Sequence, residues 1–185
     1  MNRKFSEMGC NVGRQTVLKG KTEEQLLANL TSRQIELVTE TWQIVSQDMA
    51  NVGVIIFQRL LTQHPELCKL FKKFMTLKED GTYDWDLGGM ERHALLVMQA
   101  LEAAIDNLDD SRVLSGILFE LGCKHARYNV QEDMFDKLWD ALKSGLEETL
   151  QEQMTKEVTQ AWFSVFRYIS HHIVKGMRDY RKRSQ

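Results

Sequence analysis

The chain has 185 residues, of which 43% are hydrophobic and 27% are charged, and its formal net charge is −2. These values are typical of one globular domain and exclude a disordered chain, and the longest apolar run, residues 52–57, falls far short of the roughly 20 residues that cross a bilayer. One proline and 11 glycines leave few breaks between elements, so the composition favours long helices over a β-sandwich or barrel.

Three cysteines, Cys10, Cys68 and Cys123, are too few and too scattered for a disulfide framework or a paired-cysteine metal site. The N-terminal region has no apolar stretch of signal-peptide length. We therefore expect a reducing, cytoplasmic environment. A bridge between Cys68 and Cys123 under oxidising conditions stays open as an alternative.

The charge is unevenly distributed along the chain. Residues 1–21 and residues 175–185 each carry +4, which leaves −10 for the residues between them. Basic ends are weak grounds for a nucleic-acid partner, because nucleic-acid modules more often carry a basic face with aromatic residues along the body of the domain. We therefore expect no nucleic-acid partner.

Residues 1–29 differ from the rest of the chain because they are basic, contain three glycines and show no sustained helical period. This pattern predicts a mobile N-terminal extension. If translation began at Met8, Gly9 could accept myristate and Cys10 palmitate, and the two lipids together would attach the protein to a membrane. Gly13 stands where the myristoylation motif usually has Ser or Thr, so cytoplasmic and membrane-associated locations both stay open.

From Leu30 onward the spacing of apolar residues is helical. Thr31 or Ser32 can cap a first helix, and a second apolar run ends before Pro65 because the residue before a proline resists helical geometry. The pattern predicts an all-α domain of seven to eight helices over residues 30–185. After a short segment at 66–71 and a polar loop at 78–86 come four long amphipathic stretches, roughly residues 87–107, 111–127, 131–150 and 154–180.

Two histidines lie within the apolar faces of predicted helices. His93 shares a face with Met90 and Val97, and His125 shares a face with Leu121. A buried imidazole must have its ring nitrogens satisfied, so a hydrogen-bonded core histidine is the ordinary interpretation of either residue alone. Two such histidines on separate long helices favour a cofactor, and imidazole is a common ligand of haem iron.

Other cofactors fit the sequence less well. Structural zinc takes four ligands and catalytic zinc takes three protein ligands, whereas neither histidine has a second histidine or a carboxylate at ligand spacing on its own helix face. The sequence also has no nucleophile elbow, phosphate-binding loop or dinucleotide-binding glycine motif. Haem is therefore the cofactor that we expect.

From Leu30 to about Tyr180 the chain resembles the globin family, because several motifs occur in the order that the family has them. These motifs are Trp42; Gly53; His64-Pro65-Glu66-Leu67 followed by Phe71 and Phe74; His93 with Val97; and Leu121-Gly122-Cys123-Lys124-His125. His93 and His125 are 32 positions apart. The resemblance implies a globin fold that encloses a haem pocket.

The resemblance also implies the ligands and walls of that pocket. His125 would be the proximal ligand of the iron in haem b, with a backbone carbonyl near Leu121 as the partner of its other ring nitrogen. His93 would be the distal histidine, and Phe71 would stack on the porphyrin. The other residues expected to contact haem are Phe57, Phe74, Val97, Leu121, Val130 and Phe135.

Within the family, the extension and Phe57 resemble globin X, the Arg92-His93-Ala94 pattern resembles cytoglobin, and the spacing of the two histidines resembles neuroglobin. These relatives imply that both histidines bind iron until O2, CO or NO displaces His93. The implied roles are redox work with an unidentified partner, nitric oxide or nitrite chemistry, or gas sensing; nitrite reductase or nitric oxide dioxygenase activity would be a side activity. The alternatives are five-coordinate iron for oxygen storage or transport and a haem-free interaction module. Both a monomer and a homodimer stay open.

Overall fold

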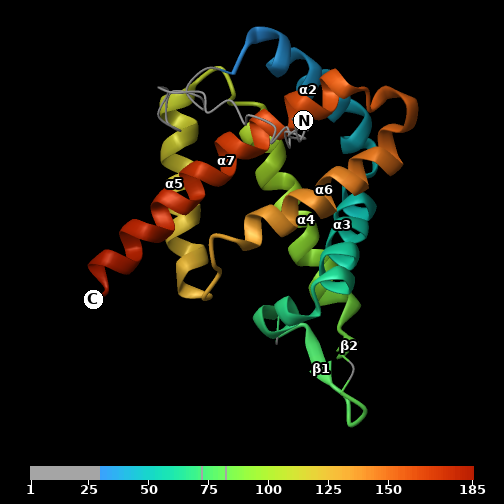
Figure 1. Ribbon diagram of the computed structural model, residues 1–185, viewed down its shortest axis with the longest axis vertical. Helices are drawn as coiled ribbons and strands as arrows, with labels where there is room; N and C mark the ends of the chain where they lie inside the picture. Colours follow the sequence, from blue (N-terminus) through green and yellow to red (C-terminus); the bar gives the residue numbers. More distant parts are fainter. Residues whose placement is uncertain (1–29, 72, 82) are drawn as a thin grey trace, which may run out of the picture.

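The computed structural model describes residues 30–71, 73–81 and 83–185, so Gly9, Cys10 and the rest of the predicted extension lie outside the described residues. The described residues form six α-helices and three short 3₁₀ helices, which confirms the predicted all-α fold (Figure 1). None of these helices is long and apolar enough to span a membrane. The α-helices are α2 (Ser32–Val45), α3 (Met49–Gln63), α4 (Leu87–Ile105), α5 (Ser111–Arg127), α6 (Met134–Leu150) and α7 (Lys156–Arg183), and the 3₁₀ helices are η1 (Ser46–Asp48), η2 (Pro65–Phe71) and η3 (Gln151–Gln153).

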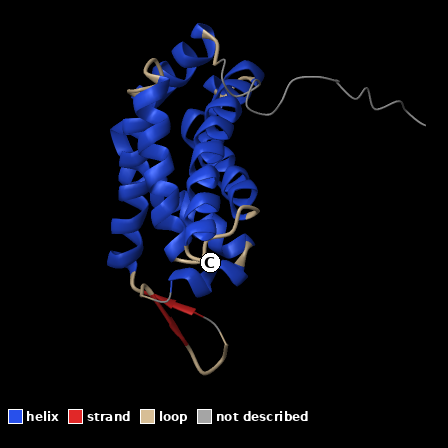
Figure 2. Cartoon of the chain, turned by 90° about the vertical axis from the view of Figure 1, so that its left-hand side faces the viewer, coloured by secondary structure: helices blue, strands red, loops and turns tan. Residues whose placement is uncertain are grey.

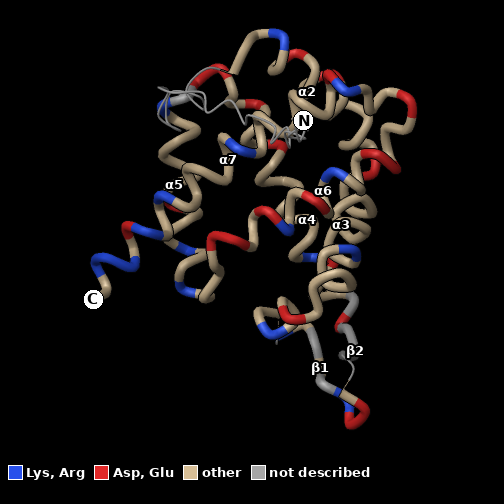
Figure 3. The backbone as a smooth tube through the Cα atoms, viewed as in Figure 1, with Lys and Arg blue, Asp and Glu red and all other residues tan. Residues whose placement is uncertain are grey.

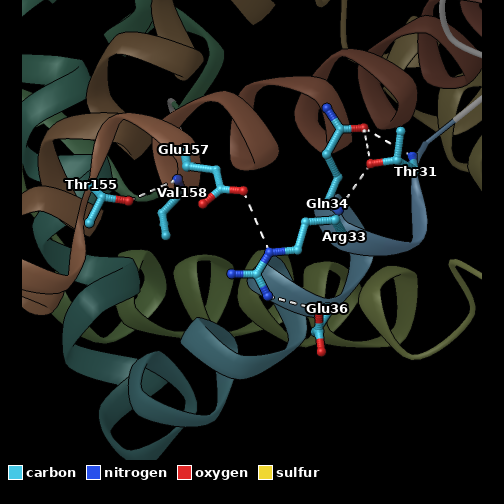
Figure 4. A network of polar contacts seen from close by, with 7 residues as sticks. All are labelled: Thr31, Arg33, Gln34, Glu36, Thr155, Glu157 and Val158. Carbon is cyan, nitrogen blue, oxygen red and sulfur yellow. Dashed lines mark hydrogen bonds and ion pairs between the residues drawn. The ribbon is translucent and has the colours of Figure 1, made fainter.

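Hydrogen-bonded caps set the residues at which α2 and α7 begin (Figure 4). Thr31 Oγ1 accepts a hydrogen bond from Gln34 N at 3.2 Å, and Gln34 Oε1 accepts one from Thr31 N at 3.0 Å, which completes a capping box. At the start of α7, Thr155 Oγ1 accepts a hydrogen bond from Val158 N at 3.2 Å. Each side chain satisfies a backbone N–H that has no partner inside its helix. Of the two predicted caps of the first helix, Thr31 and Ser32, the one observed is Thr31.

α2 packs against α7 through a buried aromatic contact. Trp42 and Trp162 are 5% and 1% exposed, and their ring centroids lie 6.2 Å apart. Trp162 Nε1 donates a hydrogen bond to Thr41 Oγ1 at 2.9 Å, so the buried indole N–H is satisfied. At the surface, Arg33 Nε lies 3.5 Å from Glu157 Oε1 and joins the same two helices (Figure 4).

A two-stranded hairpin, which the hydrophobic pattern did not predict, begins just before the predicted polar loop at 78–86 and has its second strand within it. Strands β1 (Met75–Leu77) and β2 (Tyr83–Trp85) pair antiparallel, with Thr76 opposite Asp84. Gly81 has a φ of +81°, a left-handed geometry that suits glycine in a tight turn. The hairpin projects from one end of the helical body (Figure 2), and its strands are too short to show the period-two alternation by which a strand is recognised.

Two helix crossings depend on glycine. Where α3 crosses α4, a Cβ atom on Gly53 would lie 2.8 Å from Met98 Cγ and 3.2 Å from the Ala94 carbonyl oxygen, so glycine at this position lets the two helices approach closely. α5 and α7 approach more closely still, because a Cβ atom on Gly122 or Gly176 would overlap the backbone of the other helix. The two helices lie against each other (Figure 1), and this crossing fixes the C-terminal half of α5.

We expect Gly176→Ala to lower the free energy of unfolding by about 3 kcal/mol, because the added methyl group overlaps the Phe119 carbonyl and forces α5 and α7 apart. Gly116→Ala is the matched control, since nothing lies within 4 Å of the added Cβ and alanine is the better helix former. Urea denaturation followed by circular dichroism measures both variants. A Gly176→Ala protein as stable as the wild type would contradict the close crossing.

Candidate cofactor site

A cavity of about 860 Å³ lies between the helices and is the size of a cofactor site. Its walls come from η2 and from α3, α4, α5, α6 and α7. All nine residues that the sequence predicted for the site line this cavity: Phe57, Phe71, Phe74, His93, Val97, Leu121, His125, Val130 and Phe135. The fold therefore brings together residues that are distributed over most of the described chain.

His125 lies in the last turn of α5 and has a fixed ring orientation. Its Nδ1 atom is 2.8 Å from the carbonyl oxygen of Leu121, one turn earlier on the same helix. A carbonyl oxygen can only accept a hydrogen bond, so Nδ1 carries the proton and donates it. The lone pair of the neutral ring is then on Nε2, which is the arrangement that a metal-binding imidazole needs. The carbonyl expected as partner of this ring is the one observed.

His93 projects from α4 into a cage of aromatic rings. The His93 ring centroid lies 5.1 Å from that of Phe57, 5.4 Å from that of Phe71 and 6.2 Å from that of Phe74. Among the described residues the imidazole contacts these three rings and makes no hydrogen bond, and it is partly rather than fully buried. Burial lowers the pKa of His93 and the nearby His125 lowers it further, so the neutral form is favoured.

The aromatic cage follows from local sequence features. Phe57 lies on the buried face of α3 and is 4% exposed, and Phe71 is the last residue of η2, a helix that begins at Pro65. Phe57 and Phe71 meet edge to face with their ring centroids 5.9 Å apart. Phe74 fits beside them because Gly89 has no side chain, since a Cβ atom there would overlap the Phe74 ring.

The sequence did not predict the polar and exposed residues of the cavity. Lys69, Lys73 and Lys124 line it and supply positive charge. Leu96 and Tyr128 also line it, yet they are 63% and 65% exposed, so they lie where the cavity opens to solvent. Lys124 could have been predicted as a cavity residue because it is next to His125 in the sequence. Lys73 follows η2, and nothing in the sequence around it indicates a cavity.

α7 supplies part of the cavity wall. Ile169 and Ile173 belong to the apolar stripe that the sequence shows along α7, and both line the cavity. Phe166, three residues before Ile169 on the same helix, lines it as well. Further apolar residues from α4, α5 and α6 include Leu101, Leu118, Leu138 and Leu142. These side chains make the cavity mostly apolar.

Cys68 and Cys123 are both buried and free of disulfide bonds. Cys68 belongs to η2, and burial raises the pKa of its thiol, which favours the unreactive protonated form. The Cys123 thiol donates a hydrogen bond to the Gly176 carbonyl oxygen at 3.4 Å. Both thiols are thus part of the packing around α5 and η2.

The set of possible metal ligands decides which cofactor fits the cavity. Among the described residues no group of three or more His, Cys, Asp or Glu side chains could hold a metal ion, whereas a zinc site needs at least three. Two imidazoles in one apolar cavity suit haem, because the porphyrin nitrogens supply the remaining ligands of the iron. The residues present therefore fit a haem group, which His125 and His93 would hold.

Comparison with known proteins agrees with this geometry. The sequence model of the globin family matches residues 54–173. Neuroglobin from Tetraodon nigroviridis is 30% identical over 152 residues, which are 81% of this chain and 94% of that protein. Cytoglobin-1 from Oryzias latipes is 30% identical over 134 residues, which are 72% of this chain and 75% of that protein.

A solved structure shares the fold. The crystal structure of a hexacoordinated heme protein from an anhydrobiotic tardigrade superposes with a TM-score of 0.71 at 23% sequence identity, covering 80% of this chain and 96% of that one. The family model spans more than half of the chain, and its matched segment contains both cavity histidines. The chain belongs to the globin family.

Proposed function

We propose that this globin binds haem b through His125 and His93 together, and that O2, CO or NO binds by displacing His93. Membership of the family implies a haem cofactor and diatomic gas ligands. One observation carries the finer proposal. His93 lies in an aromatic cage without a hydrogen-bond partner among the described residues, in the same cavity as an imidazole whose Nε2 is free. Binding the iron as a second ligand would use the lone pair of the neutral His93 ring, which no hydrogen bond occupies.

Several groups of the chain would each contribute in a different way to holding the cofactor. Haem supplies the iron at which the gas binds. The Leu121 carbonyl keeps the His125 ring oriented and increases its basicity as a ligand. The aromatic cage excludes water from the side of His93, which opposes oxidation and loss of the group. Lys69, Lys73 and Lys124 line the cavity and would pair with the carboxylates of haem.

Competition by His93 would set how the protein responds to a gas. An internal ligand lowers the apparent gas affinity by the fraction of molecules in which it is dissociated. Binding is then limited by the opening of His93, which suits redox work, nitric oxide or nitrite chemistry, or gas sensing better than oxygen storage. Phe57 gives the cavity no hydroxyl group at its position, so nitric oxide dioxygenase chemistry would have no phenol there.

We expect the reduced protein under argon to give a sharp, split low-spin visible spectrum, and His93→Ala to give a broad high-spin band because one axial ligand is lost. His64→Ala is the matched control, because His64 does not line the cavity and pairs with Glu66 at 3.5 Å instead. Absorption spectroscopy of the three proteins measures the difference. A broad high-spin band already in the wild type would overturn hexacoordination and favour an oxygen-storage globin.

The rate of CO binding tests the gating step separately. In the wild type we expect the observed rate to reach a plateau as CO concentration rises, because dissociation of His93 becomes limiting. In His93→Ala the rate should stay proportional to CO concentration and exceed the wild-type plateau by about tenfold or more, as expected when the competing ligand is removed. Flow-flash or stopped-flow mixing provides the rates, and proportional rates in both proteins would argue against an internal ligand.

A further inference from the structure

The last turns of α7 reach the segment that joins α5 to α6, just beyond His125. Arg178 donates from Nε and Nη2 to the two carboxylate oxygens of Glu132, at 2.9 Å and 2.5 Å. Arg181 Nη2 donates to the carbonyl oxygen of Val130. Figure 3 shows basic residues gathered along this end of α7. We call Arg178 and Arg181, with their partners Glu132 and Val130, the clasp.

The backbone of Val130 connects the clasp to His125. Its N–H donates to the His125 carbonyl oxygen at 3.4 Å, while its own carbonyl accepts from Arg181. The Tyr128 N–H donates to the same His125 carbonyl at 3.0 Å. Between them, Asn129 has a φ of +59°, so the chain reverses in the left-handed region directly after α5. Any shift of Val130 is therefore transmitted to the turn that carries His125.

A third contact ties the same two helix ends together. The Arg127 guanidinium lies over the ring of Tyr180, 5.4 Å from its centroid. Helix ends otherwise fray, because their last carbonyl groups have no partner within the helix. Here the end of α5 is held from α7 by Arg181 and Tyr180.

We propose that Arg181, supported by Arg178, is a positioning residue that holds His125 in place for the iron. The inference rests on the proposed function, because it assigns the purpose of a contact to a haem ligand. Arg181 is the stronger half of the clasp: it is partly buried, and its charged donor meets a neutral backbone acceptor. The pair of Arg178 with Glu132 is more exposed, and such pairs contribute less.

The first test is the rate at which the ferric protein transfers haem to an excess of an apoglobin acceptor. Arg181→Ala should lose haem about tenfold faster, as expected for removal of a partly buried charge-assisted hydrogen bond. Arg181→Lys keeps a positively charged donor group, so its rate of haem loss should fall between those of the wild type and Arg181→Ala. Lys182→Ala removes the same charge at a neighbouring, exposed position and should stay within about twofold of the wild type. Equal acceleration by Lys182→Ala, or none by Arg181→Ala, would overturn the proposal.

A second measurement separates positioning from general stability. In the reduced His93→Ala background, the band from the bond between iron and His125 can be followed by resonance Raman spectroscopy. Arg181→Ala should shift or broaden that band, whereas Lys182→Ala should leave it unchanged. A purely structural role would lower the melting temperature without altering the band, and that result would contradict the proposal.

Hydrogen exchange in the full-length apoprotein measures, without haem, how well the clasp stabilises the turn after His125. The amides of Tyr128 and Val130 should exchange about tenfold faster in Arg181→Ala than in Lys182→Ala, because the turn after His125 opens more often. If the wild type takes up no haem, the proposed function fails while this comparison still decides whether the clasp holds the turn. If haem binds normally and exchange is unchanged, the clasp alone is refuted.

Discussion

The close crossing of α5 and α7 is the constraint on which the candidate site depends. Gly122 and Gly176 let the two backbones touch, and His125 lies within one turn of Gly122 on α5. α5 cannot rotate or slide at that crossing without backbone overlap, so α7 sets the direction in which His125 projects. The Leu121 carbonyl then fixes the rotation of the imidazole itself. A packing contact outside the cavity thus determines the geometry of a proposed metal ligand.

Burial and metal binding would both favour the neutral form of the His93 imidazole. The aromatic rings around it partly bury the imidazole, and this burial lowers its pKa. The neutral ring is the form that can bind a metal, since a protonated imidazole has no lone pair to offer. An apolar cage would be an unfavourable place for a histidine with no ligand. The same cage would be more favourable if a metal bound the lone pair of the ring.

Helical periodicity placed the two cavity histidines on apolar helix faces, whereas the resemblance to globins supplied wall residues such as Phe57 and Val130. His93 and Val97 share one face of α4, and the spacing of residues along that helix brings both to the cavity. The hairpin of β1 and β2 could not be predicted in the same way, because three-residue strands show no alternation. Local patterns also say nothing of contacts such as that between Arg178 and Glu132, 46 positions apart, which exist only once α7 crosses α5.

The claim that His93 and His125 share one iron is tested most directly by electron paramagnetic resonance of the ferric wild-type protein at neutral pH, with no added ligand. The account predicts a rhombic low-spin signal typical of two imidazole ligands, which converts to a high-spin signal in His93→Ala. An axial high-spin signal in the wild type would show that water or no ligand opposes His125. That result would contradict the account.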